Sequence, residues 1–211
     1  MTRRLILAVM LMILAAGPGR AEPAGRFDYY VLALSWQPSW CAREGDERDA
    51  ETCEAGSGAG FTLHGLWPQR IDGWPEYCRT GHRDPSRAET RAMADIMGSP
   101  GLAWHQWKKH GRCSGVSAEE YFALSRRAYD DVVRPSLLRE IGRTVRIDPA
   151  VVENAFLDVN PRMTPASAVV TCRQNYIAEV RICLSKSLVP RPCTGQAARA
   201  CTRSASLPPP R

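Results

Sequence analysis

The pattern of apolar and polar positions divides the chain into strand-like and helix-like segments. Aromatic and β-branched residues run almost unbroken through 27–36 (FDYYVLALSW), which predicts a buried strand. Residues 61–66 predict a second, short strand that ends at Pro68, because proline lacks the backbone donor that a strand interior needs. Near the C-terminus, 168–173 and 176–185 predict two more strands.

Helical spacing of apolar residues dominates the middle of the chain. Two capping-box patterns, at 86–89 and 117–120, each predict the start of a helix, and Asp148 is expected to cap another. The glycines of 98–101 are expected to break the first helix before a new one begins at Trp104. Strands, then helices, then strands predict an α+β fold: a mostly antiparallel β-sheet flanked by several α-helices.

The first residues read as an export signal. Residues 1–21 combine a basic start, an apolar run and a small-residue cleavage site, which is typical of a secretory signal peptide. We therefore expect a single domain over 22–205 and a disordered, proline-rich tail over 206–211. No further apolar run has membrane length, so no membrane association is expected after the signal is cleaved.

Cysteine content and charge refine this picture. All eight cysteines lie after the signal, which favours four disulfides in an oxidising compartment, the periplasm or the cell exterior. The formal net charge of +6 would fall with the three arginines of the signal. Such mild basicity fits an anionic polymer as a partner, but it fits an ordinary soluble protein as well. Nothing in the sequence indicates an oligomer, and a monomer is expected.

Residues 104–113 (WHQWKKHGRC) carry the most suggestive chemistry. At roughly 100° per residue, a helix here places His105, Gln106, Lys109 and His110 on one side, and glycine at 111 is expected to stop it. Imidazoles suit proton transfer near neutral pH, and an ammonium suits a phosphoryl group. The plainer alternative is a positively charged helix face with two incidental histidines.

A metal site is not predicted in this segment. Two ligands on one helix face need a spacing of four residues, whereas His105 and His110 are five apart. His64, within an apolar strand, is the other histidine of interest, and by itself it fits a core histidine bonded to a backbone carbonyl.

Taken together, the two segments resemble the ribonuclease T2 family. The family's first signature, Phe-Thr-x-His-Gly-Leu-Trp-Pro, matches 61–68, and its second, His-Glu-Trp-x-Lys-His-Gly-Thr-Cys, matches 105–113 with two departures. Gln106 replaces the glutamate, and Arg112 replaces the threonine. Ser35–Pro38 and Glu179–Cys183 add weaker support.

The resemblance implies a metal-independent endoribonuclease that needs no cofactor and whose partner is single-stranded RNA. It implies that His110 is the general base, His64 the general acid, His105 a phosphate ligand and Lys109 the group that stabilises the phosphorane. The remaining implied members of the site are Gln106, in place of the glutamate, and two base-stacking residues, Trp67 and Trp74. Core packing is the alternative for Trp67.

The resemblance also implies the disulfide pairing. The four implied disulfides are Cys78–Cys113, Cys41–Cys53, Cys183–Cys193 and Cys172–Cys201.

Two other functions remain open from the sequence. Because of Gln106, the chain could be a catalytically impaired, secreted RNA-binding protein on the same fold. It could also be a disulfide-rich binding module without an RNA partner, which would require His64 to lie far from the helical cluster.

Overall fold

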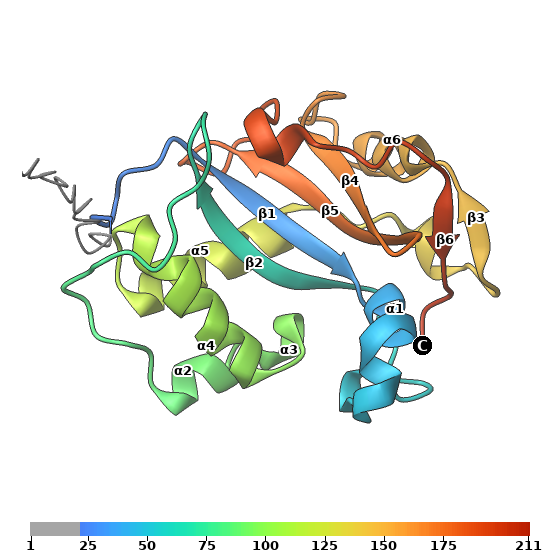
Figure 1. Ribbon diagram of the computed structural model, residues 1–211, viewed down its shortest axis with the longest axis horizontal. Coiled ribbons are helices and arrows are strands. Elements are labelled where there is room, and N and C mark those ends of the chain that lie inside the picture. The colour runs from blue at the N-terminus through green and yellow to red at the C-terminus, as the bar shows by residue number, and fades with distance from the viewer. Residues whose placement is uncertain (1–21) are drawn as a thin grey trace, which may run out of the picture.

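Three long strands form the centre of the sheet in the computed structural model, which describes residues 22–211 (Figure 1). Strand β1 (Tyr29–Trp36) lies between β2 (Phe61–Gln69) and β5 (Tyr176–Leu184), and it is antiparallel to both. Strand β4 (Ala168–Arg173) pairs with β5, also antiparallel. Apolar side chains of β1 are buried on both faces of the sheet, which explains its unbroken apolar sequence.

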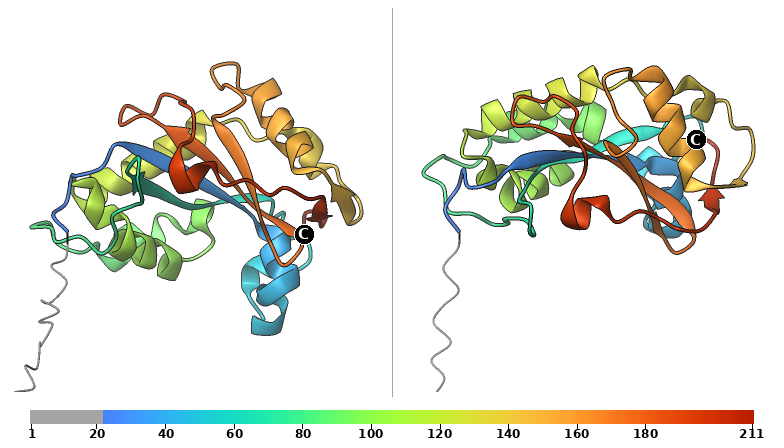
Figure 2. Two further views of the ribbon diagram at one scale, coloured as in Figure 1. Left: turned by 45° about the horizontal axis from the view of Figure 1, so that its top comes forward. Right: turned by 90° about the horizontal axis from the view of Figure 1, so that it is seen from above.

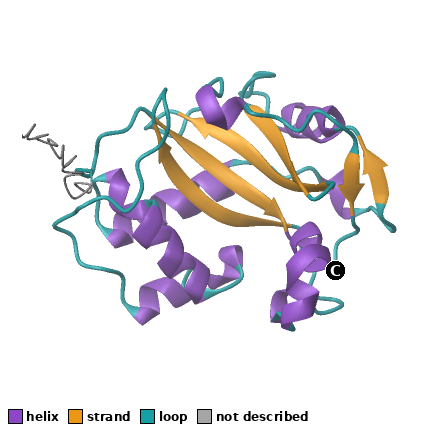
Figure 3. Ribbon diagram, in the orientation of Figure 1, coloured by secondary structure: helices purple, strands orange, loops and turns teal. Residues whose placement is uncertain are grey.

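Two short strands extend the sheet. Strand β6 (Ala205–Leu207) meets the end of β5 at one parallel pair, Tyr176 with Ser206, and its partner β3 (Val145–Ile147) is antiparallel to it. The predicted α+β fold with a mostly antiparallel sheet is therefore confirmed (Figure 3).

Helices cover one face of the sheet (Figure 2). Helices α4 and α5 contact β2, and α6 contacts β4. Both predicted capping boxes form, at Ser86 and Ser117. The helices are α1 (Gln37–Trp40), α2 (Arg87–Arg91), α3 (Ala94–Met97), α4 (Pro100–Lys109), α5 (Ala118–Asp131) and α6 (Pro149–Val159).

The main core lies between the sheet and these helices. Leu32 and Leu34 of β1, Trp107 of α4 and Phe156 of α6 are all fully buried in it. A smaller cluster that includes Tyr29, Val31 and Cys183 packs on the opposite face. Because β1 alternates between the two faces, odd-numbered residues such as Val31 face the side that is not covered by α4 and α5.

Helix α4 begins earlier than the sequence predicts. Ser99 caps it by accepting a hydrogen bond from the Leu102 amide, and Pro100 occupies the first turn, where its missing donor costs nothing. The expected break over 98–101 is therefore only a corner at Gly98.

Gly111 also has a different role from the one predicted. It follows the helix in a 3₁₀ turn, and its φ is not positive. A Cβ at this position would lie 2.6 Å from the Trp107 ring and 2.8 Å from that of Tyr121. Close packing, rather than a left-handed helix cap, therefore requires glycine here.

Two expectations about proline-containing segments were wrong. Strand β2 continues past Pro68 to Gln69, because β2 is an edge strand and its outer side needs no donors. The expected disordered tail over 206–211 is ordered: Leu207 is buried in β6, the Pro208 carbonyl accepts a hydrogen bond from Trp36 Nε1, and Arg211 pairs with Asp46.

Four disulfides form within the described residues. The pairs are those that the resemblance implies: Cys41–Cys53, Cys78–Cys113, Cys172–Cys201 and Cys183–Cys193. The signal peptide expected over 1–21 lies outside the described residues. Within 22–211, none of the helices is long and apolar enough to cross a membrane.

Candidate active site

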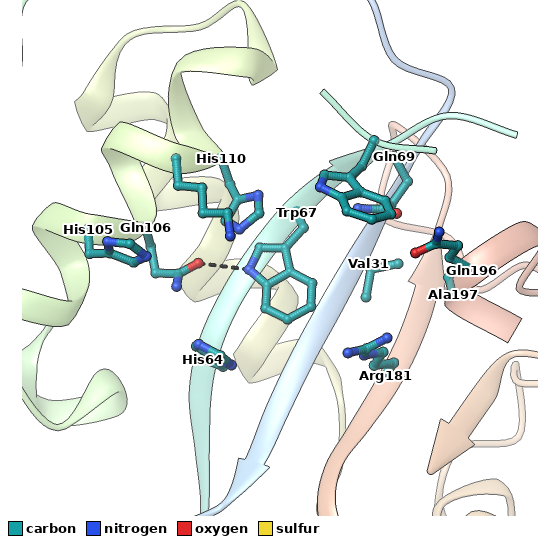
Figure 4. A pocket seen from close by; sticks show the side chains of 12 residues that line it. Val31, His64, Trp67, Gln69, His105, Gln106, His110, Arg181, Gln196 and Ala197 are labelled. Atoms are coloured by element: carbon teal, nitrogen blue, oxygen red, sulfur yellow. Dashed lines mark hydrogen bonds between the residues drawn. The ribbon is translucent and has the colours of Figure 1, made fainter. Parts of the chain in front are cut away.

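The two signature segments meet at one cavity of about 280 Å³ (Figure 4). Strand β2 contributes to one wall, and α4 with the turn that follows it contributes to the other. All seven predicted catalytic and base-binding residues line this cavity: His64, Trp67, Trp74, His105, Gln106, Lys109 and His110. A binding module in which His64 lies far from the helical cluster does not fit this arrangement.

A β-bulge orients His64. Ala33 pairs with Gly65 and Leu34 pairs with Leu63, so His64 is the extra residue of β2. Strict alternation would place His64 and Trp67 on opposite faces, because they are three residues apart. The bulge shifts the alternation, and both side chains face the cavity.

Trp67 lies between the two candidate catalytic histidines. Its ring is stacked on His110, with centroids 5.2 Å apart, and it meets His64 edge to face at 5.1 Å. Its Nε1 donates a 2.7 Å hydrogen bond to Oε1 of Gln106 (Figure 4). Trp67 is half-buried, and these contacts on several sides fix the orientation of its ring.

Burial sets the protonation state of His110. Its side chain is buried, and its Nδ1 has no hydrogen-bond partner among residues 22–211. Desolvation, reinforced by the positive charges of Lys109, His64 and His105, lowers the pKa of His110 to about 3. The imidazole is therefore neutral across the physiological range.

The cationic rim of the cavity is more exposed. Lys109 Nζ lies 3.6 Å from a carboxylate oxygen of Glu76, and both side chains are partly exposed. Trp74 lies at the rim, where its Nε1 donates a 3.4 Å hydrogen bond to Glu76. His105 is exposed at the opposite edge.

The two tryptophans of α4 differ in burial. Trp107 is fully buried, whereas the side chain of Trp104 is 42% exposed. The helix face opposite the cavity is therefore held by one indole rather than two.

The structure gives Arg112 a structural role. Asp84 accepts hydrogen bonds from Trp107 Nε1 at 2.9 Å and from Arg112 Nη2 at 2.6 Å, and it also pairs with Lys108. Burial acts to raise the pKa of Asp84, but these donors outweigh it and lower the pKa. Arg112 thus ties the loop before α2 to the end of α4.

Two charged residues of the site were missed by the sequence analysis. Glu179 Oε1 lies 2.5 Å from His64 Nδ1, and its other oxygen accepts two 3.2 Å hydrogen bonds from Arg181. Burial acts to raise the pKa of Glu179, but the hydrogen bonds and charges of His64 and Arg181 outweigh it and lower the pKa. The sequence did offer a signal for them, because Glu179 and Arg181 are two charged residues at alternate positions of an otherwise apolar strand.

A metal centre finds little support in the described chain. The one cluster there with suitable spacing is Cys41, Asp46 and Cys53, whose two sulfurs are joined in a disulfide. The cavity instead offers imidazoles, an ammonium and a guanidinium, which suit a negatively charged substrate. The α+β fold thus carries one cavity whose side chains are of the kinds that suit proton transfer and the binding of a phosphoryl group.

Comparisons with known proteins identify the family. The profile of the Ribonuclease T2 family matches residues 27–193. A ribonuclease of Aeromonas hydrophila is 33% identical over 165 residues, which cover 77% of this chain and 74% of that protein. Ribonuclease I of Escherichia coli is 25% identical over 89% of this chain and 87% of its own length.

Among solved structures, trichomaglin, described as an S-like ribonuclease, superposes with a TM-score of 0.67 at 22% identity. The match covers 86% of this chain and 98% of trichomaglin, and it supports the fold. The chain belongs to the ribonuclease T2 family and is an endoribonuclease.

Proposed function

We propose that the protein cleaves single-stranded RNA by transphosphorylation through a 2′,3′-cyclic phosphate, with His110 as base and His64 as acid. The observation that carries the proposal is that both imidazoles line one cavity and contact the same indole, Trp67. RNA supplies its own nucleophile, so the protein needs only a base, an acid and a group that stabilises charge.

In the first step, neutral His110 takes the proton of the 2′-hydroxyl, and the 2′-oxygen attacks phosphorus. The lowered pKa of His110 keeps its imidazole unprotonated, as a base must be before it acts, although a lower pKa also makes it a weaker proton acceptor. As the bond from phosphorus to the 5′-oxygen breaks, His64 gives a proton to that oxygen. In the second step a water molecule opens the cyclic phosphate, and the two histidines exchange roles.

Charge stabilisation falls to the cations around the cavity. Lys109 and His105 line the cavity from α4, and Lys109 holds the charge of the phosphorane. Glu76, which is paired with Lys109, releases it to the phosphate when substrate binds.

Of the two tryptophans of the cavity, Trp74 is the one to which we assign base binding. Trp74 at the rim is free on one side to stack a base, which gives little sequence preference. Trp67 acts chiefly as the wall between the histidines, because His110 already occupies one of its faces. The four disulfides favour an oxidising compartment, so we propose that the enzyme is exported. That it acts as a monomer remains an expectation from the sequence.

An oligodeoxynucleotide with one ribonucleotide tests this mechanism. We expect a single cut on the 3′ side of the ribonucleotide, a 2′,3′-cyclic phosphate that later becomes a 3′-phosphate, and no effect of a chelator. The matched control carries a 2′-O-methyl group at the same position and must stay intact. Cleavage of that control, or loss of activity with the chelator, would contradict the mechanism.

The competing function is an RNA-binding protein without catalysis, for which Gln106 is the specific observation. The parent protein and His110→Ala are compared on the same substrate. Equal inactivity of the two, together with retained RNA binding, would support the competing function.

A further inference from the structure

Glu179 reaches His64 across an intervening strand. The two residues lie on β5 and β2, which flank β1, so their backbones are two strand spacings apart, roughly 10 Å. The β1 residues between them are small: Ala33 pairs with both Gly65 and Arg181, and Ser35 pairs with Thr62 and Glu179. These small side chains leave room for an imidazole and a carboxylate to meet above β1.

The Glu179 carboxylate is fixed on both of its oxygens. Oε1 faces His64 Nδ1, and Oε2 is held by the guanidinium of Arg181. The Glu179 side chain is only 13% exposed, so water competes little for these contacts. A buried carboxylate held by a guanidinium and an imidazole is expected to stay ionised.

The other ionisable side chains around His64 are mostly basic. His105, Lys109 and His110 face the same cavity from α4 and the residue after it, and Arg181 faces it from β5. Glu44 lines the neighbouring cavity and is paired with Arg43 and Arg48. Within residues 22–211, Glu179 is the one acidic side chain that pairs with His64.

We propose that Glu179 is a positioning residue for the general acid: its carboxylate accepts the Nδ1 proton of His64 and thereby aims Nε2 into the cavity. The contact fixes the tautomer and the ring orientation, because only the protonated nitrogen can donate to a carboxylate. It also balances the charge of the imidazolium before proton transfer. When His64 gives its Nε2 proton to the departing 5′-oxygen, it becomes neutral and keeps the Nδ1 proton toward Glu179. This role rests on the proposed function of His64.

The proposed role of Glu179 can be tested with two substrates, one of which needs a general acid and one of which does not. Uridylyl-(3′→5′)-adenosine has a basic alkoxide leaving group that must be protonated, whereas 4-nitrophenolate leaves uridine 3′-(4-nitrophenyl phosphate) without a proton. A general acid is worth about 10²–10⁴-fold in rate. We expect the cleavage rate of Glu179→Ala to fall about 10-fold or more on the dinucleotide and less than about 3-fold on the nitrophenyl ester. The loss on the dinucleotide is only part of the full general-acid effect, because His64 itself is still present. Glu179→Gln, which keeps an uncharged acceptor, should fall between the parent and Glu179→Ala.

Three variants calibrate the assay. His64→Ala should show the same selective loss, and His110→Ala should lose activity on both substrates because both need the base. Glu153→Gln is the matched control, since Glu153 lies on α6 and bonds only the Val170 amide. An NMR resonance of the His64 Nδ1 proton, strongly downfield in the parent and displaced in Glu179→Gln, reports the contact without relying on turnover.

The outcomes separate the two proposals. A parent that cleaves neither substrate overturns the proposed function and this role with it. An active parent with equal losses on both substrates in the folded Glu179 variants, or with no loss on either, overturns the positioning role alone. An unchanged Nδ1 resonance in Glu179→Gln does so as well.

Discussion

The side-chain carbonyl of Gln106 accepts a 2.7 Å hydrogen bond from Trp67 Nε1. This contact joins α4 to β2 at the centre of the cavity, because Trp67 also touches both His64 and His110. Gln106 is 1% exposed, so the bond is shielded from water and holds the indole in one orientation. The orientation of two imidazoles thus depends on a residue that itself transfers no proton.

Gly65→Ala should disturb this contact directly. A Cβ at position 65 would lie 2.3 Å from Gln106 Oε1 and 2.5 Å from Trp67 Nε1, so one of them must move. Overpacking of this kind costs about 1–3 kcal/mol in stability. Since small displacements of catalytic groups are costly, kcat/KM on RNA should fall about 10-fold or more.

Gly81→Ala is the matched control for that substitution. Gly81 lies in a loop with nothing within 4 Å of its added Cβ, and its φ is not positive. We expect near-parental melting temperature and kcat/KM from it. A Gly65→Ala enzyme as active as Gly81→Ala would show that the bond between Trp67 and Gln106 does not organise the site.

Local signals in the sequence were sufficient for most elements of the fold. The run 27–36 predicted β1, and serine three residues before glutamate predicted the caps of α2 and α5. The two wrong predictions about proline-containing segments were those in which the effect of proline depends on the surrounding structure. Pro68 continues a strand because that strand lies at the sheet edge, and the tail is ordered because Trp36 and β3 bind it.

The part of the site that the sequence analysis missed depends on information that is not local. Glu179 meets His64 only because β1 lies between β2 and β5 and carries a small residue at Ala33. The bulge at His64 is likewise set by pairing with β1 and not by the residues of β2 alone. Strand order and register of this kind cannot be read from a single segment.

His110 should make the stability of the fold depend on pH. Its pKa is lowered from 6.5 to about 3 in the folded state by burial, so the unfolded chain binds the proton more readily. Stability from this residue is complete above about pH 6.5 and is lost as pH falls toward 3, with a slope of up to about 1.4 kcal/mol per pH unit. Urea unfolding at several pH values measures the slope.

Two variants test whether His110 is the source of this dependence of stability on pH. His110→Asn removes the buried titrating group and should flatten the dependence between pH 6.5 and pH 4. His82→Asn removes an exposed loop histidine and should leave the dependence unchanged. Equal slopes in the parent and in His110→Asn would mean that other groups are responsible.

Asp84 should contribute more to the stability of the fold than its partner Arg112 does. This is so although Arg112 is a departure from the family signature and Asp84 lies outside that signature. Asp84→Ala leaves the indole donor of Trp107 without its acceptor, at a cost of about 1–3 kcal/mol. Arg112→Thr removes only a partly exposed ion pair, worth about 1 kcal/mol or less. Denaturant unfolding compares the two, and a larger loss in Arg112→Thr would contradict the assignment. Neither residue lines the cavity, so both variants should still cleave RNA.

Gln106 is the departure closest to the chemistry. The amide accepts the indole proton as a carboxylate would, so the architecture of the site survives the replacement. What changes is the charge. The charges that act on His110 are those of Lys109, His64 and His105, all of which disfavour its protonated form. A carboxylate at position 106 would oppose them and raise the pKa of His110.

We therefore expect the natural protein to be an active ribonuclease whose activity persists further into acid than that of Gln106→Glu. The measurement is kcat/KM against pH for the parent, Gln106→Glu and His110→Ala on one RNA substrate, since this parameter reports the groups of the free enzyme. The acid limb should move to higher pH in Gln106→Glu, because His110 is then protonated sooner on acidification and loses its role as base. His110→Ala should be lower than both by about 10²-fold or more. If the parent is instead as inactive as His110→Ala and Gln106→Glu restores cleavage, the glutamate is indispensable, and the natural chain is an RNA-binding protein on a ribonuclease fold.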